Sequence, residues 1–240
     1  MEGKHLILKG NFRSKKAEKS YKRLVARLDP WSPITEQYRA IRANILLSSK
    51  DNNIRTLLIT SSGKGEGKTT TASNLAVVIA QQGKKVLLID TDMRKPSLHH
   101  YFRKKNISGL STILTKRDTL ENVVHTDEIK NLFILTSGPI SPNPSDLLAS
   151  KEMEELMEVA LKTYDLIIFD SPPLLVVSDA HVIANKCDGS LIVVADGKTD
   201  KDEFLKTKDL LEVINANILG VVFNNKKQKK RKNNDYYYRT

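Results

Sequence analysis

The chain has 240 residues, a single cysteine and a formal net charge of +11 at pH 7. This length is enough for one sizeable α/β core and does not require two domains. The lone Cys187 excludes a disulfide framework and a Cys-based zinc site within one chain, and it favours a reducing compartment. The apolar runs are far shorter than the ~20 residues of a spanning helix, and the N-terminus lacks the apolar core of a signal peptide, so we expect a cytoplasmic protein.

The positive charge is concentrated at the two ends of the chain. Residues 1–30 and residues 226–240 carry +6 each, which leaves −1 for residues 31–225. A nearly neutral body argues against a DNA-binding face, so no direct nucleic-acid partner is expected. Basic ends favour acidic partners or an anionic membrane surface, although solvated ends without a specific partner are an open alternative.

Residues 1–32 show no helical or strand period, and we expect them to form a mobile basic arm. A helix is predicted to follow over residues 34–49. Within it Glu36, Arg39 and Arg42 recur every third residue, which places all three on one helical face. Such a face is either solvated or a docking surface, and both readings stay open on spacing alone.

A glycine-rich stretch at residues 61–70 carries the strongest motif. It follows a short apolar strand and precedes a helix, and this context, with the Gly-Lys-Thr sequence, is typical of a phosphate-binding loop. Backbone N–H groups and the helix start can converge there on a phosphate, Lys68 can reach the β- and γ-phosphates, and Thr69 can ligate Mg²⁺. The usual pattern has glycine where Ser62 stands, and the alternative is a glycine turn with no ligand. The residues expected to bind the nucleotide are Gly63, Lys64, Gly65, Glu66, Gly67, Lys68, Thr69 and Thr70.

Two apolar strands are predicted to end in aspartate, at Asp90 and at Asp170, and Asp92 follows the first of them. Ligands of open α/β sheets bind beyond the carboxyl ends of the strands. Asp90 and Asp92 are therefore expected near the nucleotide if their strand neighbours the strand before the glycine loop. Asp170 is the second acid that phosphate-binding-loop proteins place near Mg²⁺.

The remaining pattern sets the fold class. Strands are expected over 131–136, 189–195 and 218–223, with a helix over 201–215 before the last strand. Alternating strands and helices of these lengths predict an α/β fold with a P-loop NTPase-like parallel sheet and helices on both faces. No packed core can be built from residues 226–240, where three of the seven tyrosines, Tyr236, Tyr237 and Tyr238, stand in a row.

These motifs together resemble the bacterial tyrosine kinases of capsule and exopolysaccharide synthesis, in the form found in Gram-positive bacteria. The resemblance covers about residues 33–240, and its departures are Lys64, where proline is common, and Thr69, where serine is frequent. Its marks are Gly65-Glu66-Gly67-Lys68-Thr69, Leu88-Ile89-Asp90-Thr91-Asp92-Met93-Arg94-Lys95-Pro96, Phe169-Asp170-Ser171-Pro172-Pro173, Glu36-Gln37-Tyr38-Arg39-Ala40-Ile41-Arg42, the segment 138–148 and the terminal tyrosines.

The resemblance implies a kinase domain at residues 33–225 and a tyrosine-rich tail at 226–240. The implied reaction is transfer of the ATP γ-phosphate to tyrosine, on protein substrates and on the tail of a neighbouring subunit. Lys68 would neutralise phosphates, Thr69, Asp92 and Asp170 would hold Mg²⁺, and Asp90 would accept the tyrosine proton. The roles of Asp90 and Asp92 are exchangeable at this level, because both follow one strand end.

The resemblance also implies partners. Residues 33–50 would form an oligomerisation helix whose Glu36, Arg39 and Arg42 build the contact between subunits of a homo-oligomeric ring. A separate transmembrane activator would recruit the chain to the inner face of the membrane, and a cognate tyrosine phosphatase would reverse the modification.

Two other functions are compatible with the predicted P-loop NTPase-like fold. A partition or cell-division ATPase that binds DNA or membrane would share the fold and the basic ends. Such ATPases carry a second lysine where Gly63 stands, and the terminal tyrosines also argue against this class. A non-catalytic ATP-binding scaffold for polysaccharide export is opposed by the intact set of Lys68, Thr69, Asp90 and Asp170.

Overall fold

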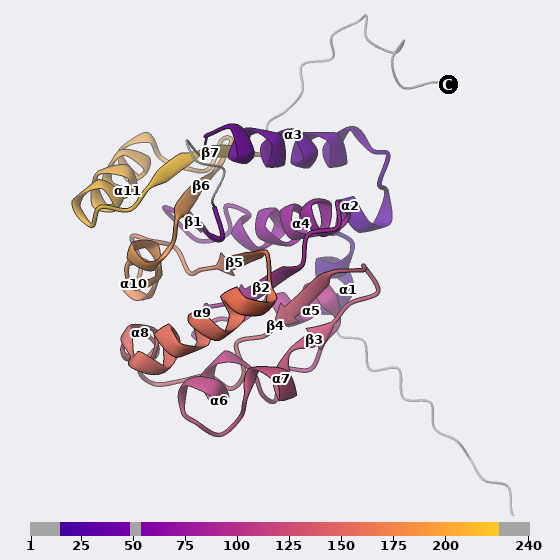
Figure 1. The fold of residues 1–240 in the computed structure, drawn as a ribbon. Coiled ribbons are helices and arrows are strands. Elements are labelled where there is room, and N and C mark those ends of the chain that lie inside the picture. Colours follow the sequence, from indigo (N-terminus) through magenta and orange to yellow (C-terminus); the bar gives the residue numbers. More distant parts are fainter. Residues whose placement is uncertain (1–14, 49–53, 226–240) are drawn as a thin grey trace, which may run out of the picture.

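A mostly parallel sheet forms the centre of the protein, whose computed structural model describes residues 15–48 and 54–225. Within those residues the sheet has seven strands in the spatial order β3-β4-β2-β5-β1-β6-β7, and only the pair of β3 and β4 is antiparallel (Figure 1). The strands are β1 (Thr56–Ser61), β2 (Val86–Asp90), β3 (His125–Thr126), β4 (Leu132–Leu135), β5 (Leu166–Asp170), β6 (Gly189–Ala195) and β7 (Ile218–Asn224). The helices are α1 (Lys15–Tyr21), α2 (Val25–Leu28), α3 (Pro33–Ser48), α4 (Lys68–Ala80), α5 (Leu98–Phe102), α6 (Leu110–Leu114), α7 (Leu120–Val123), α8 (Pro144–Ala149), α9 (Lys151–Thr163), α10 (Asp179–Lys186) and α11 (Lys201–Val213).

Helices cover both faces of the sheet, because successive side chains of a strand point to opposite sides. On one face Leu57 and Ile59 of β1 pack with residues of α3, α4 and α5. On the other face Leu58 packs with residues of α6, α8, α9, α10 and α11. The predicted α/β fold, with a mostly parallel sheet covered on both sides, is confirmed.

The strand order places β5 between β1 and β2. Asp90 and Asp92 were expected near the nucleotide if their strand, β2, neighboured β1, the strand before the glycine loop. The two strands are not neighbours, because β5 lies between them. Asp170 at the end of β5 lies in register with Ile59 of β1 on one side and with Asp90 of β2 on the other. Because neighbouring strands are about 4.8 Å apart, Asp170 links the acids of β2 to the loop after β1.

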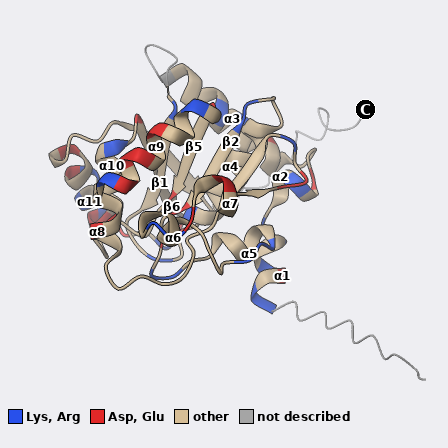
Figure 2. Ribbon diagram, turned by 60° about the horizontal axis from the view of Figure 1, so that its bottom comes forward, with Lys and Arg blue, Asp and Glu red and all other residues tan. Residues whose placement is uncertain are grey.

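The N-terminal segment 15–28 differs from the mobile arm expected from the sequence. The segment α1 packs against α5 and α2 packs against α4, with Leu24 and Ala26 fully buried. Basic residues remain exposed along α1 (Figure 2). Helices of seven and four residues are too short to show an amphipathic period, which explains why the pattern gave no signal. Residues 1–14 lie outside the described part of the chain.

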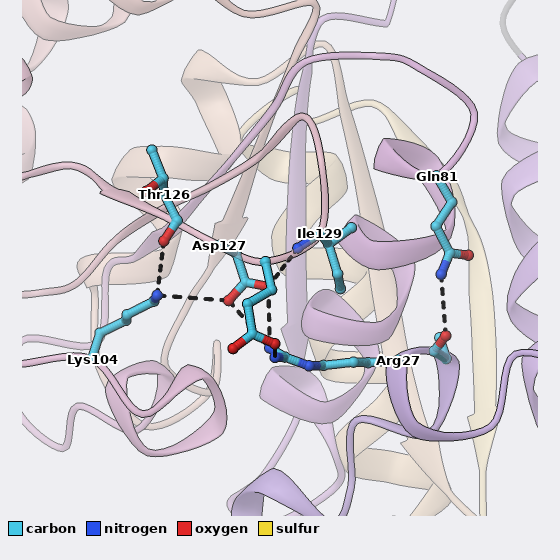
Figure 3. A network of polar contacts seen from close by, with 8 residues as sticks. Arg27, Gln81, Lys104, Thr126, Asp127 and Ile129 are labelled. Atoms are coloured by element: carbon cyan, nitrogen blue, oxygen red, sulfur yellow. Dashed lines mark hydrogen bonds and ion pairs between the residues drawn. The ribbon is translucent and has the colours of Figure 1, made fainter.

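Polar contacts fasten this segment to the domain (Figure 3). Arg27 donates from Nη1 to both carboxylate oxygens of Asp127, at 3.1 and 3.3 Å, and both side chains are largely buried. Lys104 lies 3.8 Å from the same carboxylate and donates to the Thr126 carbonyl at 2.8 Å. Gln81 at the end of α4 donates to the carbonyl of Ala26 at 3.3 Å. The N-terminal segment is therefore part of the folded domain.

The region between β4 and β6 also differs in detail from the prediction. Between β4 and β5 lie two helices, α8 and α9, which are separate because Ser150 between them has extended backbone angles. The helix α10 after β5 was not predicted, and it supplies a buried carboxylate described below.

Candidate functional site

The glycine loop joins β1 to α4 with a backbone that only glycine adopts easily. Gly65 and Gly67 have φ of +73° and +105°, in the left-handed region that side chains disfavour. A Cβ on Gly67 would stand 2.0 Å from the Asn224 side-chain nitrogen, so a side chain there would displace Asn224 from its hydrogen bond to the Glu66 carbonyl. Ser62, which replaces the usual glycine, is buried and accepts a hydrogen bond from Thr207 of α11 at 2.8 Å. The departure from the motif is thus accommodated by a partner on a distant helix.

Lys68 begins α4 and lies beneath this loop. Its side chain is buried, and Nζ donates to the Ser61 hydroxyl at 3.0 Å. Ser61 in turn donates to the Gly63 carbonyl at 2.7 Å, so the lysine is tied to the loop through one hydroxyl. Burial lowers the pKa of Lys68 because the charged form loses hydration. A cation held at the bottom of a glycine cradle is suited to a polyphosphate.

Asp90 is fully buried at the end of β2 and organises the loop after it. Its Oδ2 accepts backbone hydrogen bonds from Ser97 and Leu98 at 3.0 and 2.9 Å, and its Oδ1 accepts one from Asp92 at 3.1 Å. Burial raises the pKa of this carboxyl to about 7, although the three donors act in the opposite direction. Oδ2 is saturated, whereas Oδ1 retains one acceptor position.

Asp170 is also buried, and its Oδ1 has no hydrogen-bond partner among the described residues. Burial raises its pKa well above the usual range, and the neighbouring Asp90 adds to the effect because two adjacent carboxylates repel. Asp92 is less buried, and its Oδ1 accepts from the backbone of Lys95 at 2.9 Å. The sheet edge therefore holds carboxylates that a cation would stabilise in their charged form.

No group of three His, Cys, Asp or Glu side chains in the described residues is arranged to hold a metal by itself. This is compatible with Mg²⁺, which usually takes one or two carboxylates and completes its shell with water and phosphate oxygens. The Thr69 hydroxyl lies at the same edge and forms a hydrogen bond to Asp170 that lowers the pKa of that carboxyl. The Thr69 hydroxyl, the carboxylates of Asp90 and Asp170 and the glycine loop thus lie at the same edge of the sheet.

A charged contact at the edge where Asp90 and Asp170 lie gave no signal in the sequence. Arg94, two residues after Asp92, donates from Nε and Nη2 to the two oxygens of Asp179, at 2.8 and 3.0 Å. The Asp179 side chain is fully buried at the start of α10, and it also accepts from Ser145 of α8. Three segments that leave the carboxyl edge of the sheet are therefore joined. No local pattern pairs positions so far apart in the chain.

Residues at the ends of two other strands also hold the glycine loop, through Glu66. Glu66 is buried, and its Oε1 accepts from the Thr199 hydroxyl at 2.8 Å. Its backbone carbonyl accepts from the Asn224 side chain, also at 2.8 Å. Thr199 follows β6 and Asn224 ends β7, so two further strand ends position the loop. The sequence offered no signal for either partner.

The charged face of α3 is used within the chain. Glu36 and Arg39 form an ion pair with each other, and Arg42 donates to the carbonyl of Val78 on α4 at 2.9 Å. Close to this face, large apolar side chains are exposed, among them Trp31 at 82% and Leu47 at 82%. The structure therefore brings two of the three residues together and turns the third towards α4. Tyr236, Tyr237 and Tyr238 lie outside the described residues.

Comparison with known proteins gives a consistent result. Residues 54–199 match a family model described as an AAA domain. The tyrosine-protein kinase YwqD of Bacillus subtilis is 46% identical over 212 residues, which cover 88% of this chain and 90% of that protein. The crystal structure of the chimerical protein CapA2B2 superposes with a TM-score of 0.84 at 40% identity, and the match covers 87% of this chain and 92% of that one.

A more distant likeness concerns the fold alone. The septum site-determining protein MinD of Pyrococcus horikoshii, complexed with Mg-ADP, has a TM-score of 0.63 at 23% identity, over 74% of this chain and 72% of that one. The division-type ATPase considered from the sequence therefore shares the architecture of this chain, while the much higher identities belong to the kinases.

Proposed function

The chain belongs to the family of bacterial tyrosine-protein kinases, and from this premise we propose that it transfers the γ-phosphate of ATP to tyrosines in the control of capsule or exopolysaccharide synthesis. The observation that carries the proposal is that Lys68, under a glycine cradle, is close enough to Asp170 for its charge to lower the pKa of that carboxyl, while Asp90 pairs with Asp170 at the adjacent strand end. Phosphoryl transfer needs alignment and charge neutralisation, and this arrangement offers both.

The phosphates would lie in the glycine loop, where Lys68 and the loop N–H groups would neutralise their charge. Thr69, Asp92 and Asp170 would hold Mg²⁺, and the unpartnered Oδ1 of Asp170 supports that assignment. A bound Mg²⁺ would supply further neutralisation of the phosphate oxygens. The rest of the work falls to the protein, which orients the acceptor hydroxyl and takes its proton.

The proton acceptor is assigned to Asp90. Its pKa of about 7 suits a general base near neutral pH, and Oδ1 keeps one free acceptor position. Asp92 is the alternative, because it is more exposed to an incoming side chain. Comparing Asp90→Asn with Asp92→Asn separates them. The base variant should lose turnover at every Mg²⁺ concentration, whereas excess Mg²⁺ should partly rescue loss of a metal ligand.

The chain's own terminal tyrosines are the proposed acceptors, in a neighbouring subunit. The segment 226–235 before Tyr236 can span at most about 35 Å, which is on the order of the width of a domain of this size. Three phosphotyrosines would add roughly −5 to −6 charge, which is close to the opposite of the +6 carried by residues 226–240. Phosphorylation would therefore weaken docking of the tail at an acidic site and loosen the assembly.

The proposed assembly is a ring built through α3. Exchange of the Glu36–Arg39 pair between subunits, with Arg42 on the same face, would give a head-to-tail contact, and the exposed Trp31 adds apolar area beside it. No helix among residues 15–48 and 54–225 has the length and apolar character needed to cross a bilayer. The proposed partners are a transmembrane activator, which would link the chain to the membrane, and a tyrosine phosphatase, which would reset the tail.

Mixing a chain without the phosphate-binding lysine and a chain without acceptor tyrosines tests the reaction. Lys68→Met removes the phosphate-binding cation, and a chain truncated after residue 235 removes the acceptors. Incubation of the mixture with MgATP should give phosphotyrosine on the Lys68→Met chain, detected by blotting, while that chain alone stays blank. A blank blot from the mixture, with both chains folded and associated, rejects transfer between subunits. Phosphorylation by Lys68→Met alone rejects the assigned site.

A further inference from the structure

A second lysine reaches the glycine loop from a different part of the chain. The Lys198 ammonium lies 2.6 Å from the place where a Cβ on Gly65 would stand. Lys198 belongs to the turn between β6 and α11, more than 130 residues away in the sequence. Gly65 has a φ of +73°, so its backbone faces the lysine with no side chain between them. The loop is thus approached by Lys68 from α4 and by Lys198 from the end of β6.

The turn that carries Lys198 is fastened to the loop it approaches. The Ala195 carbonyl accepts from the backbone N–H groups of Lys198 and Thr199, both at 3.0 Å. The Thr199 hydroxyl donates to Glu66 at 2.8 Å and accepts from the Ala195 N–H at 2.9 Å. Because Glu66 is itself a member of the glycine loop, the backbone of Lys198 is held in a set position relative to that loop.

Two ammonium groups at one loop repel each other. Burial is the main cause of the lowered pKa of Lys68, and the charge of Lys198 lowers it further. A polyanion lying between two such groups would be attracted by both. The arrangement therefore favours a ligand with several negative charges, such as the phosphates of a nucleotide.

We propose that Lys198 is a second cationic ligand of the nucleotide phosphates, delivered by the turn after β6 and positioned through Thr199 and Glu66. The proposal rests on the nucleotide site proposed above. The partition and cell-division ATPases carry a second lysine where this chain has Gly63. Lys198 would supply such a positive charge from the turn after β6. Thr199 is the positioning residue for Lys198, since its hydroxyl joins the turn that carries the lysine to Glu66 of the loop.

Titration calorimetry on the full, dephosphorylated chain measures the effect directly. The ligands are ADP and the non-hydrolysable β,γ-imido analogue of ATP, so the readout is binding and not turnover. Lys198→Met should weaken both by about tenfold, the size expected for one charge-assisted hydrogen bond. Lys198→Arg keeps the charge and should stay within about threefold of the parent. Lys206→Met, an exposed lysine on α11, is the matched control and should bind like the parent.

A double-mutant cycle tests the positioning. Thr199→Val removes the hydroxyl that joins the turn to Glu66 and leaves every charge in place. It should weaken nucleotide binding by itself, but Lys198→Met with Thr199→Val should be no worse than Lys198→Met, because the hydroxyl acts through the lysine. Fully additive losses would overturn the positioning role.

Three outcomes separate this proposal from the site on which it rests. If Lys68→Met binds as tightly as the parent, the nucleotide site itself is wrong. If Lys68→Met loses binding while Lys198→Met stays within about twofold of the parent, only the role of Lys198 is overturned. If Lys198→Met changes the preference between ADP and GDP but not the dependence of binding on salt, the lysine contacts the base, and the phosphate role is rejected.

Discussion

The glycine loop at 62–67 and the N-terminal segment at 15–28 both adjoin α4, but their structures depend on different parts of the chain. The loop is continuous with the first turn of the helix, and its shape is set by its own glycines. The N-terminal segment is held by contacts with residues as distant as Asp127 and Glu128. A motif with its own backbone geometry can be identified in a sequence, whereas a segment held only by tertiary contacts cannot.

The two regions nevertheless meet. Asn74 in the middle of α4 accepts from the Ala26 N–H at 2.9 Å and donates to the carbonyls of Arg23 and Thr70, at 2.9 and 2.8 Å. The Thr70 hydroxyl also bonds to the Tyr101 hydroxyl at 2.7 Å. The helix α4 therefore begins at the glycine loop and contacts the docked N-terminal segment through Asn74, one turn further on.

The largest expected effect comes from Gly67→Ala. The new Cβ would meet the Asn224 side chain at a φ of +105°, so the backbone is strained and Asn224 is displaced from its contact with the loop. Nucleotide affinity should fall by about a hundredfold or more, with a loss of about 1–2 kcal/mol in unfolding free energy from backbone strain. Calorimetry with ADP and urea unfolding measure the two quantities.

Gly83→Ala is the matched control for that variant. Gly83 has a φ of +93° but no atom within 4 Å of its added Cβ. Gly83→Ala should lower the unfolding free energy by a similar amount, because the backbone strain is similar, and it should leave nucleotide affinity unchanged. Equal loss of affinity in both variants would mean that strain alone, and not the shape of the loop, limits binding.

Asn74→Ala tests how the N-terminal segment 15–28 is held to α4. It leaves the buried Ala26 N–H and two carbonyls without their side-chain partner, which should lower the unfolding free energy by about 2–3 kcal/mol. Urea unfolding measures the loss, and limited trypsinolysis at Lys22 and Arg23 should become faster. Asn185→Ala, which removes one exposed hydrogen bond, should cost less than about 1 kcal/mol. Equal losses would show that the N-terminal segment is not held through Asn74.

Tyr101→Phe tests the contact between α5 and the first turn of α4. It removes the hydroxyl that bonds to Thr70 at 2.7 Å and that accepts from Arg23 at 3.5 Å. Unfolding free energy should fall by about 1 kcal/mol, the usual contribution of one such hydrogen bond, while ADP affinity changes by less than about threefold. A large loss of affinity with unchanged stability would contradict a structural role for this hydroxyl.

The smallest effect is expected from His99→Gln, and only below neutral pH. Burial, with the charges of His100 and Lys16, lowers the pKa of His99 from 6.5 to about 4. The unfolded chain therefore binds a proton that the folded chain does not, so stability falls as the pH drops from 6.5 towards 4. His99→Gln should flatten this decline, measured as unfolding free energy in urea at several pH values. An unchanged slope in that window would rule out His99 as a contributor.

The candidate site was predictable in its parts but not in its assembly. Lys68, Asp90 and Asp170 stand at the ends of elements with clear local signals. Nothing in the pattern indicated that β5 lies between β1 and β2, because strand order depends on how helices pack across the sheet. The contact of Arg94 with Asp179 was invisible for the same reason.

Regular spacing also has limits. Glu36, Arg39 and Arg42 share a helical face as predicted, yet Arg42 turns to the carbonyl of Val78 while the other two pair with each other. Helical periodicity predicts which side of a helix a side chain lies on. It does not predict which neighbouring helix that side chain will contact.

The sequence by itself determined the α/β class, the glycine loop with Lys68 and Thr69, the acids at the strand ends and the family of bacterial tyrosine kinases. The loop and the strand ends are each encoded within about ten consecutive residues, where backbone preference and hydrophobic period act, and the class and the family follow from the order of such motifs along the chain. Only the tertiary structure decided the docking of residues 15–28, the neighbours of Asp170 and the approach of Lys198 to Gly65. These depend on contacts between residues far apart in the chain, whose free energy is gained only when the whole sheet and its helices have packed.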